Sequence, residues 1–94
     1  MSRAFVKEDD YVPPRRFTLP EQDDPGYDAA AAAALIEAAR DGVTSDAEAA
    51  TGYRWGDAAL RPHVRRMLEQ EESRPEPEQD RRLMQVARRF LRAG

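Results

Sequence analysis

The chain has 94 residues, no cysteine, 35% charged residues and a formal net charge of −3. This length supports one small domain, and the lack of cysteine excludes a disulfide-stapled secreted domain. No stretch approaches the run of about 18 apolar residues that a membrane span needs, and residues 1–10 lack the apolar core of a signal peptide. We therefore expect a cytoplasmic protein without a membrane partner.

Residues 1–26, here called the N-terminal arm, differ from the rest of the chain. Prolines interrupt the arm too often for a helix of ordinary length; they are Pro13, Pro14, Pro20 and Pro25. The arm is also rich in aromatic residues, which disordered segments usually lack; these are Phe5, Tyr11 and Phe17. An extended arm is predicted, and its aromatic side chains either pack on the chain's own core or dock on a partner.

The first predicted helix covers the alanine-rich residues 29–39, because alanine is the best helix former. Asp24 or Asp28 is expected to cap its start. Gly42 is expected to end it, since glycine adopts the left-handed conformation that closes many helices.

A second, short helix is predicted for residues 45–51. Ser45 and Glu48 have the spacing of a capping box, and Gly52 stops the helix. A turn with two large aromatic residues, Tyr53 and Trp55, follows. We favour a place in the core for this pair over the alternative of an interface anchor.

Two further helices complete the prediction. Asp57 is expected to cap a turn, and Pro62 to stand at the start of a helix that reaches about Glu72. Residues 73–78 form a linker, and the last helix runs from about Pro77 to Arg92. Its apolar stripe has helical spacing: Leu83, Val86, Ala87, Phe90 and Leu91.

No segment alternates at the period of a strand for long enough to propose a sheet. The predicted fold is therefore all-α: a small bundle of three or four short helices in residues 27–94, preceded by the extended, proline-rich arm of residues 1–26.

The order of the predicted helices offers a helix-turn-helix as one functional interpretation. Gly52 and Tyr53 match the glycine and apolar residue found in many such turns, although Glu48 stands where the pattern has a small residue. Residues 27–61 are net acidic, which weakens attraction to phosphates. DNA binding is thus an alternative, and its expected contact residues are Arg61, Arg65 and Arg66.

Arg81, Arg88 and Arg92 share one face of the last predicted helix. This face could contact an acidic partner or an RNA backbone. Acidic residues at the predicted start of the helix and arginines at its end complement the helix dipole, however. We therefore favour a solvated helix face.

Catalytic chemistry finds little support in the sequence. His63 is the only histidine, whereas a zinc site needs several histidine or cysteine ligands. Ser45 and Ser73 are better used as helix caps, and no glycine-rich phosphate loop is present. We expect no catalytic residue, no metal and no cofactor, and hence a protein that is not an enzyme.

Residues 1–10 read MSRAFVKEDD and are followed by prolines. This opening resembles the extreme N-terminus of some Gre-type bacterial transcription elongation factors and their relatives. In those proteins such an arm precedes a coiled-coil domain that enters the secondary channel of RNA polymerase. The remaining residues depart from that family, since no long helical hairpin with an acidic tip is visible and no transcript-cleavage residue can be transferred. The resemblance implies only that the arm is a docking element.

The leading interpretation is a non-enzymatic protein-interaction module, an accessory protein of the transcription machinery that docks through its arm on RNA polymerase or another transcription protein. Self-association as a homodimer is a further interpretation, because dimerisation commonly supplements a small core. The expected partner-binding residues are Phe5, Val6, Lys7, Glu8, Asp9, Asp10, Tyr11 and Phe17.

Overall fold

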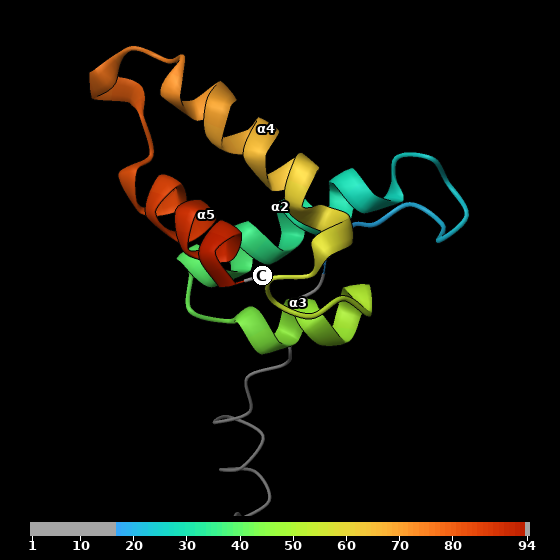
Figure 1. The fold of residues 1–94 in the computed structure, drawn as a ribbon. Helices are drawn as coiled ribbons and strands as arrows, with labels where there is room; N and C mark the ends of the chain where they lie inside the picture. Colours follow the sequence, from blue (N-terminus) through green and yellow to red (C-terminus); the bar gives the residue numbers. More distant parts are fainter. Residues whose placement is uncertain (1–16, 94) are drawn as a thin grey trace, which may run out of the picture.

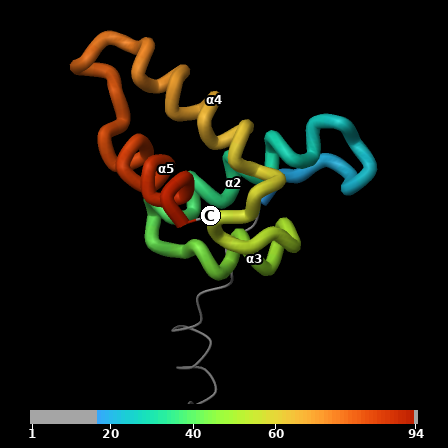
Figure 2. Tube along the Cα trace, viewed as in Figure 1, coloured from blue at the N-terminus to red at the C-terminus, as the bar shows by residue number. Residues whose placement is uncertain are grey.

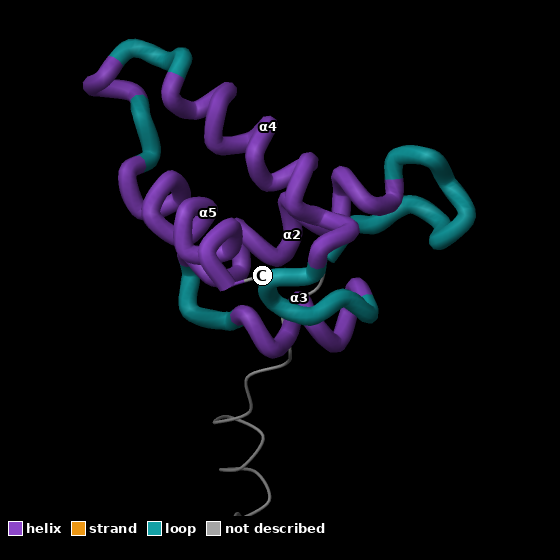
Figure 3. Tube along the Cα trace, viewed as in Figure 1, coloured by secondary structure: helices purple, strands orange, loops and turns teal. Residues whose placement is uncertain are grey.

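The computed structural model describes residues 17–93, and these residues form four α-helices without any strand (Figures 1 and 3). The helices are α2 (Tyr27–Arg40), α3 (Thr44–Thr51), α4 (Arg61–Glu72) and α5 (Arg81–Ala93). Two short 3₁₀ turns, η1 (Ala58–Leu60) and η2 (Glu76–Glu78), precede α4 and α5. The predicted all-α class is therefore confirmed for this part of the chain.

Helix α2 is the central element of the body. It packs against α3, α4 and α5, while α4 and α5 also pack against each other (Figure 2). Its small side chains allow this close approach from several directions, because alanine fills little space between helix axes. The buried residues of α2 are Tyr27, Ala31, Ala32, Ala34, Leu35, Ile36 and Ala38.

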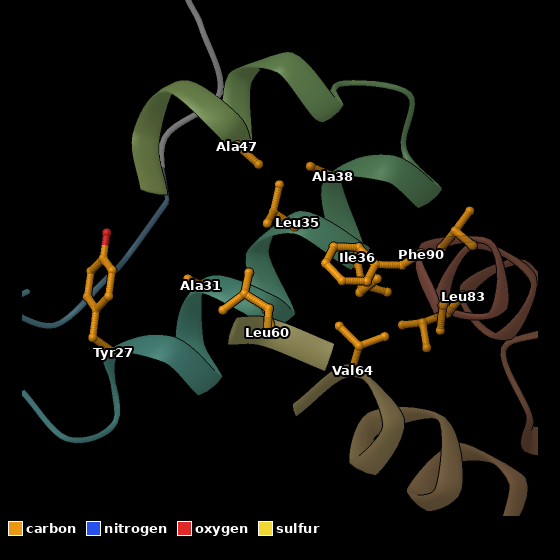
Figure 4. Packing of buried hydrophobic residues seen from close by; sticks show 13 residues of the cluster. Tyr27, Ala31, Leu35, Ile36, Ala38, Ala47, Leu60, Val64, Leu83 and Phe90 are labelled. Carbon is orange, nitrogen blue, oxygen red and sulfur yellow. The ribbon is translucent and has the colours of Figure 1, made fainter. Parts of the chain in front are cut away.

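The core lies where these helices converge. Phe90 of α5 and Val64 of α4 are fully buried beside Ile36 of α2 (Figure 4). Leu60 from η1 is also fully buried. Each large apolar side chain removed from water in this way contributes about 1.5–3 kcal/mol to stability, so these few residues are the main source of cohesion in so small a body.

Two predicted helix caps are wrong. Gly26 stands at the cap position of α2, where no side chain accepts a hydrogen bond, and Asp24 instead accepts from the Gly26 N–H at 2.7 Å. Val43 stands at the cap of α3, again without a side-chain bond, so Ser45 and Glu48 do not form the predicted capping box. The Glu48 carboxylate instead accepts a hydrogen bond from the backbone N–H of Trp55 at 2.8 Å.

The other predicted helix boundaries of this region are confirmed. Gly42 and Gly52 follow α2 and α3 with φ of 82° and 81°, the left-handed conformation that glycine accepts without strain. Asp57 caps η1 by accepting from the Ala59 N–H at 2.8 Å. Pro62 lies in the first turn of α4.

The last helix begins later than predicted, at Arg81 rather than at about Pro77. Pro77 lies in η2, and Gln79 is extended with φ −71° and ψ 136°. The Gln79 side chain donates to the carbonyls of Glu72 and Arg74. This segment is therefore held against the end of α4, and Asp80 becomes the residue that starts α5 by accepting from the Leu83 N–H at 3.0 Å.

The final residues of the predicted arm contact the body. Phe17 and Leu19 are half-buried and pack against the core. At this end of the arm, the aromatic side chain therefore packs on the chain's own core, which was the first of the two alternatives.

Candidate functional site

The aromatic turn around Tyr53 and Trp55 is fixed by hydrogen bonds to α2 and α3. The Tyr53 hydroxyl donates to Asp28 Oδ1 of α2 at 2.5 Å, and the Tyr53 N–H donates to the Thr51 hydroxyl at 3.2 Å. The Trp55 N–H donates to the Glu48 carboxylate of α3. Every polar anchor of the turn is thus a residue of the body.

The rings of this turn pack inward as well. The Trp55 ring meets the Phe90 ring nearly edge-on, with centroids 4.9 Å apart and planes at 72°, a favourable aromatic geometry. Tyr53 lies 6.4 Å from Tyr27, centroid to centroid. Tyr53 and Trp55 are half-buried against the core, which confirms the preferred interpretation of the pair as packing residues.

The hydrogen bond from Tyr53 to Asp28 has an electrostatic consequence. Because the Asp28 carboxylate accepts a hydrogen bond from the protonated phenol and so stabilises it, the pKa of Tyr53 is raised to about 12. The phenol stays protonated at physiological pH. This makes it a structural donor rather than a general base.

Most of the expected partner-binding residues lie outside the described part of the chain: Phe5, Val6, Lys7, Glu8, Asp9, Asp10 and Tyr11. The exception is Phe17, which is half-buried on the core. At the start of α2, Tyr27 is only 6% exposed, and its hydroxyl donates to the Thr51 carbonyl at 2.8 Å. The structure therefore fixes the point at which the arm joins the body.

The residues expected to contact DNA do not share one environment. Arg65 and Arg66 are exposed on α4, whereas Arg61 is half-buried, and its Nη1 atom is buried without a hydrogen-bond partner. Residues 52–60 separate α3 from α4, although a helix-turn-helix joins its two helices by about three or four residues. The connection between α3 and α4 is therefore longer than the tight turn that the helix-turn-helix interpretation requires.

The candidate catalytic groups remain dispersed. His63 is half-buried at the start of α4, and its Nδ1 atom has no hydrogen-bond partner. The Ser73 hydroxyl donates to the Glu69 carbonyl at the end of α4, as a capping residue does. Among residues 17–93 no group of three or more histidine, cysteine or acidic side chains is placed to hold a metal ion. Nor does any helix of this range have the length and hydrophobicity to cross a bilayer.

Helix α5 carries a concentration of positive charge. Its exposed residues include five arginines and no acidic residue: Arg81, Arg82, Arg88, Arg89 and Arg92. The expectation that acidic residues open this helix is confirmed for Asp80, which accepts from the Leu83 N–H, but it is wrong for Glu76 and Glu78, which belong to η2. Arg82 and Arg89 had not been grouped with the other three, although the helical period of 100° per residue places them beside that face.

An open surface depression borders the first half of this face. Only Arg88 among the face residues forms an ion pair in the described chain, with Glu72 at 2.9 Å. The residues that line the depression are Glu76, Gln79, Arg81, Arg82, Met84, Gln85 and Arg88.

The same helix is held at its start by a charged contact with α2. Asp80 Oδ2 accepts from Arg40 Nη1 at 3.0 Å, while its other oxygen accepts from the Leu83 N–H. The Leu83 N–H and the Arg40 guanidinium lower the pKa of Asp80. The two carboxylates that accept from Arg40, those of Asp41 and Asp80, raise the pKa of that guanidinium.

Comparisons with known proteins give no significant match: no family model, no curated protein and no solved structure is similar to this chain. No function can therefore be transferred from a relative. Only the surfaces of the chain itself carry functional information.

Proposed function

We propose that this protein is a non-enzymatic interaction module that docks its N-terminal arm on a protein of the transcription machinery, with RNA polymerase as the first candidate. The observation that carries this proposal is the attachment of the arm to the body. Phe17 and Leu19 pack half-buried on the core, and residues 20–26 connect them to α2. A segment fixed at one end to a folded body has a defined point of attachment to that body.

The distribution of aromatic residues supports the same function. In the body, Tyr27, Tyr53, Trp55 and Phe90 all pack on one another or on the core. They are occupied in internal packing and leave little aromatic surface for a partner. Phe5 and Tyr11 then supply the large apolar anchors that protein interfaces favour, and the charged residues 7–10 supply the polar rim.

The choice of partner rests on the resemblance of residues 1–10 to the N-terminus of Gre-type factors. The prolines of the arm favour an extended backbone, which offers its side chains to a partner without first unfolding any element. Action on RNA polymerase would place the protein in the cytoplasm of a bacterium.

Binding to purified bacterial RNA polymerase tests this function directly. We expect full-length protein to bind and a truncated protein, residues 17–94, to lose at least about tenfold in affinity, with the same helical circular dichroism and melting temperature. The truncation keeps Phe17 and Leu19, so the core contact is preserved.

A pair of double variants sharpens the same test. F5A/Y11A removes two aromatic side chains of the arm and is expected to weaken binding as the truncation does. E21A/D23A changes two exposed side chains nearer the body and is expected to leave the affinity unchanged. Equal binding by full-length and truncated protein would refute docking through the arm.

A further inference from the structure

The exposed side of α5 forms a continuous cationic surface, here called the arginine face: Arg81, Arg82, Arg88, Arg89 and Arg92. At 100° per residue, these side chains and Gln85 between them fall within about one third of the helix circumference. All six are exposed, and α5 contains no acidic residue. Five like charges are thus concentrated on one side of a helix of 13 residues.

The stability of the helix does not account for this arrangement. Arg81 and Arg82 stand in the first turn, where the positive end of the helix dipole disfavours cations. Within residues 17–93 only Arg88 of the face has an ion-pair partner. The other four guanidinium groups have no such partner within these residues, and their like charges repel one another.

The body holds the arginine face rigidly. The opposite side of α5 buries Val86, Ala87 and Phe90 completely. Asp80 caps the start of the helix and is itself held by Arg40. A charged surface on such a fixed element loses little conformational freedom when it binds, beyond that of its own side chains.

We propose that the arginine face binds the phosphodiester backbone of a nucleic acid. Guanidinium groups donate paired hydrogen bonds that match the oxygens of phosphate. The stretch from Arg81 to Arg92 spans about 16 Å at 1.5 Å per residue, which matches roughly five phosphate steps of one strand at about 3.4 Å each.

A protein partner fits this surface less well. The face consists of guanidinium groups and one amide and offers no apolar side chain, whereas protein interfaces have an apolar centre. The net negative charge of the chain does not oppose the proposal, because the face itself carries five positive charges. Two acidic residues lie beside it: Glu72, which pairs with Arg88, and Glu76, which lines the adjoining depression. The proposal does not depend on the N-terminal arm.

Fluorescence anisotropy with a labelled 20-base-pair DNA duplex and a labelled single-stranded RNA tests the proposal on the full-length protein. We expect binding to at least one probe at low salt, with a slope of log K against log salt of about −3 to −5, as for four or five neutralised phosphates. R89Q/R92Q should lower the affinity about tenfold or more and make the slope shallower by about two.

The matched control is R65Q/R66Q, which removes two exposed arginines from α4 and changes the net charge equally. We expect it to change the affinity less than about twofold, with the helical circular dichroism of both variants unchanged. Equal losses in the two variants, or a greater loss in R65Q/R66Q, would overturn the proposal, the latter in favour of the helix-turn-helix alternative. The absence of binding to both probes at low salt, or equally tight binding of polyglutamate, would also overturn it.

Discussion

The Arg40 guanidinium at the end of α2 donates to Asp80 at 3.0 Å, and Asp80 is the residue that caps α5. One carboxylate therefore starts a helix with one oxygen and ties that helix to the centre of the body with the other. The residues are separated by 40 positions in the chain, and the contact fixes the element that carries the arginine face.

Replacement of Asp80 is expected to destabilise the fold. D80A removes a helix cap, which typically costs about 1 kcal/mol, and also removes one partner of Arg40. In a domain of this size such a loss lowers the melting temperature by roughly 4–8 °C. Thermal unfolding followed by circular dichroism measures the change, and E76Q, at an exposed residue of η2, should melt like the wild type. A melting temperature of D80A equal to that of E76Q would contradict the role given to Asp80.

The Asp80 contact also predicts a pH dependence. Because the Leu83 N–H and Arg40 lower the pKa of Asp80 in the folded protein, its ionised form is stabilising at pH values above the unfolded pKa of about 3.9. This contribution is lost as the pH falls through the lower folded pKa. Urea unfolding measures the free energy of unfolding of wild type and D80N. The difference between the two should therefore become smaller as the pH is lowered from 6 to below 3.9. A difference that stays constant over this range would show that the charge of Asp80 has no part in stability.

Tyr53 gives an independent readout at alkaline pH. Its hydrogen bond to Asp28 raises the pKa of the phenol to about 12, so the stabilisation from the neutral phenol is complete below the unfolded pKa of about 10 and is lost as the pH rises through 12. An ultraviolet titration of tyrosinate should show one ionisation near 12 that disappears in Y53F. D28N should move that ionisation downward. Persistence of the step in Y53F would assign it to another tyrosine.

Gly56 is expected to be the least replaceable glycine of the body. Its φ is 87°, and an added Cβ would approach Ala93 Cβ at 3.1 Å, whereas a Cβ on Gly42, with φ 82°, would meet nothing within 4 Å. Both alanine variants suffer the left-handed conformation at a cost of about 1–2 kcal/mol, but only G56A also pushes against the end of α5. Thermal melts should rank G56A below G42A, and the reverse order would contradict the close packing of this turn on α5.

The local elements of the body were largely predictable, because short-range chemistry determines them. The alanines before Gly42 and the proline at position 62 influence only the backbone within a few residues of them. The end of α2 and the start of α4, which they predict, are both confirmed. The core role of Trp55 was also predictable, since a small body has few other large side chains to bury.

The errors arose where a polar side chain had a distant partner. Glu48 has the spacing of a capping-box residue, yet its carboxylate binds the Trp55 N–H seven residues later. Asp28 fits a cap but accepts from Tyr53. Local spacing contains no information about such tertiary partners, so the competing bond became visible only in the folded chain.

The arginine face was partly predictable. The spacing of Arg81, Arg88 and Arg92 was visible in the sequence, but Glu76 and Glu78 were assigned to the same helix. The prolines at 75 and 77 and the cap at Asp80 instead start α5 after those residues. An error of four residues in one helix boundary thus concealed the unbalanced charge of the helix.

The proposed docking through the N-terminal arm is tested most directly by peptide competition. Labelled full-length protein is bound to purified bacterial RNA polymerase and then challenged with a synthetic peptide of residues 1–16, a scrambled peptide of the same composition, or the truncated body of residues 17–94. We expect the native peptide to displace the protein, and the scrambled peptide and the body to leave it bound. Displacement by the body but not by the native peptide would contradict the claim and move the docking surface to the helices.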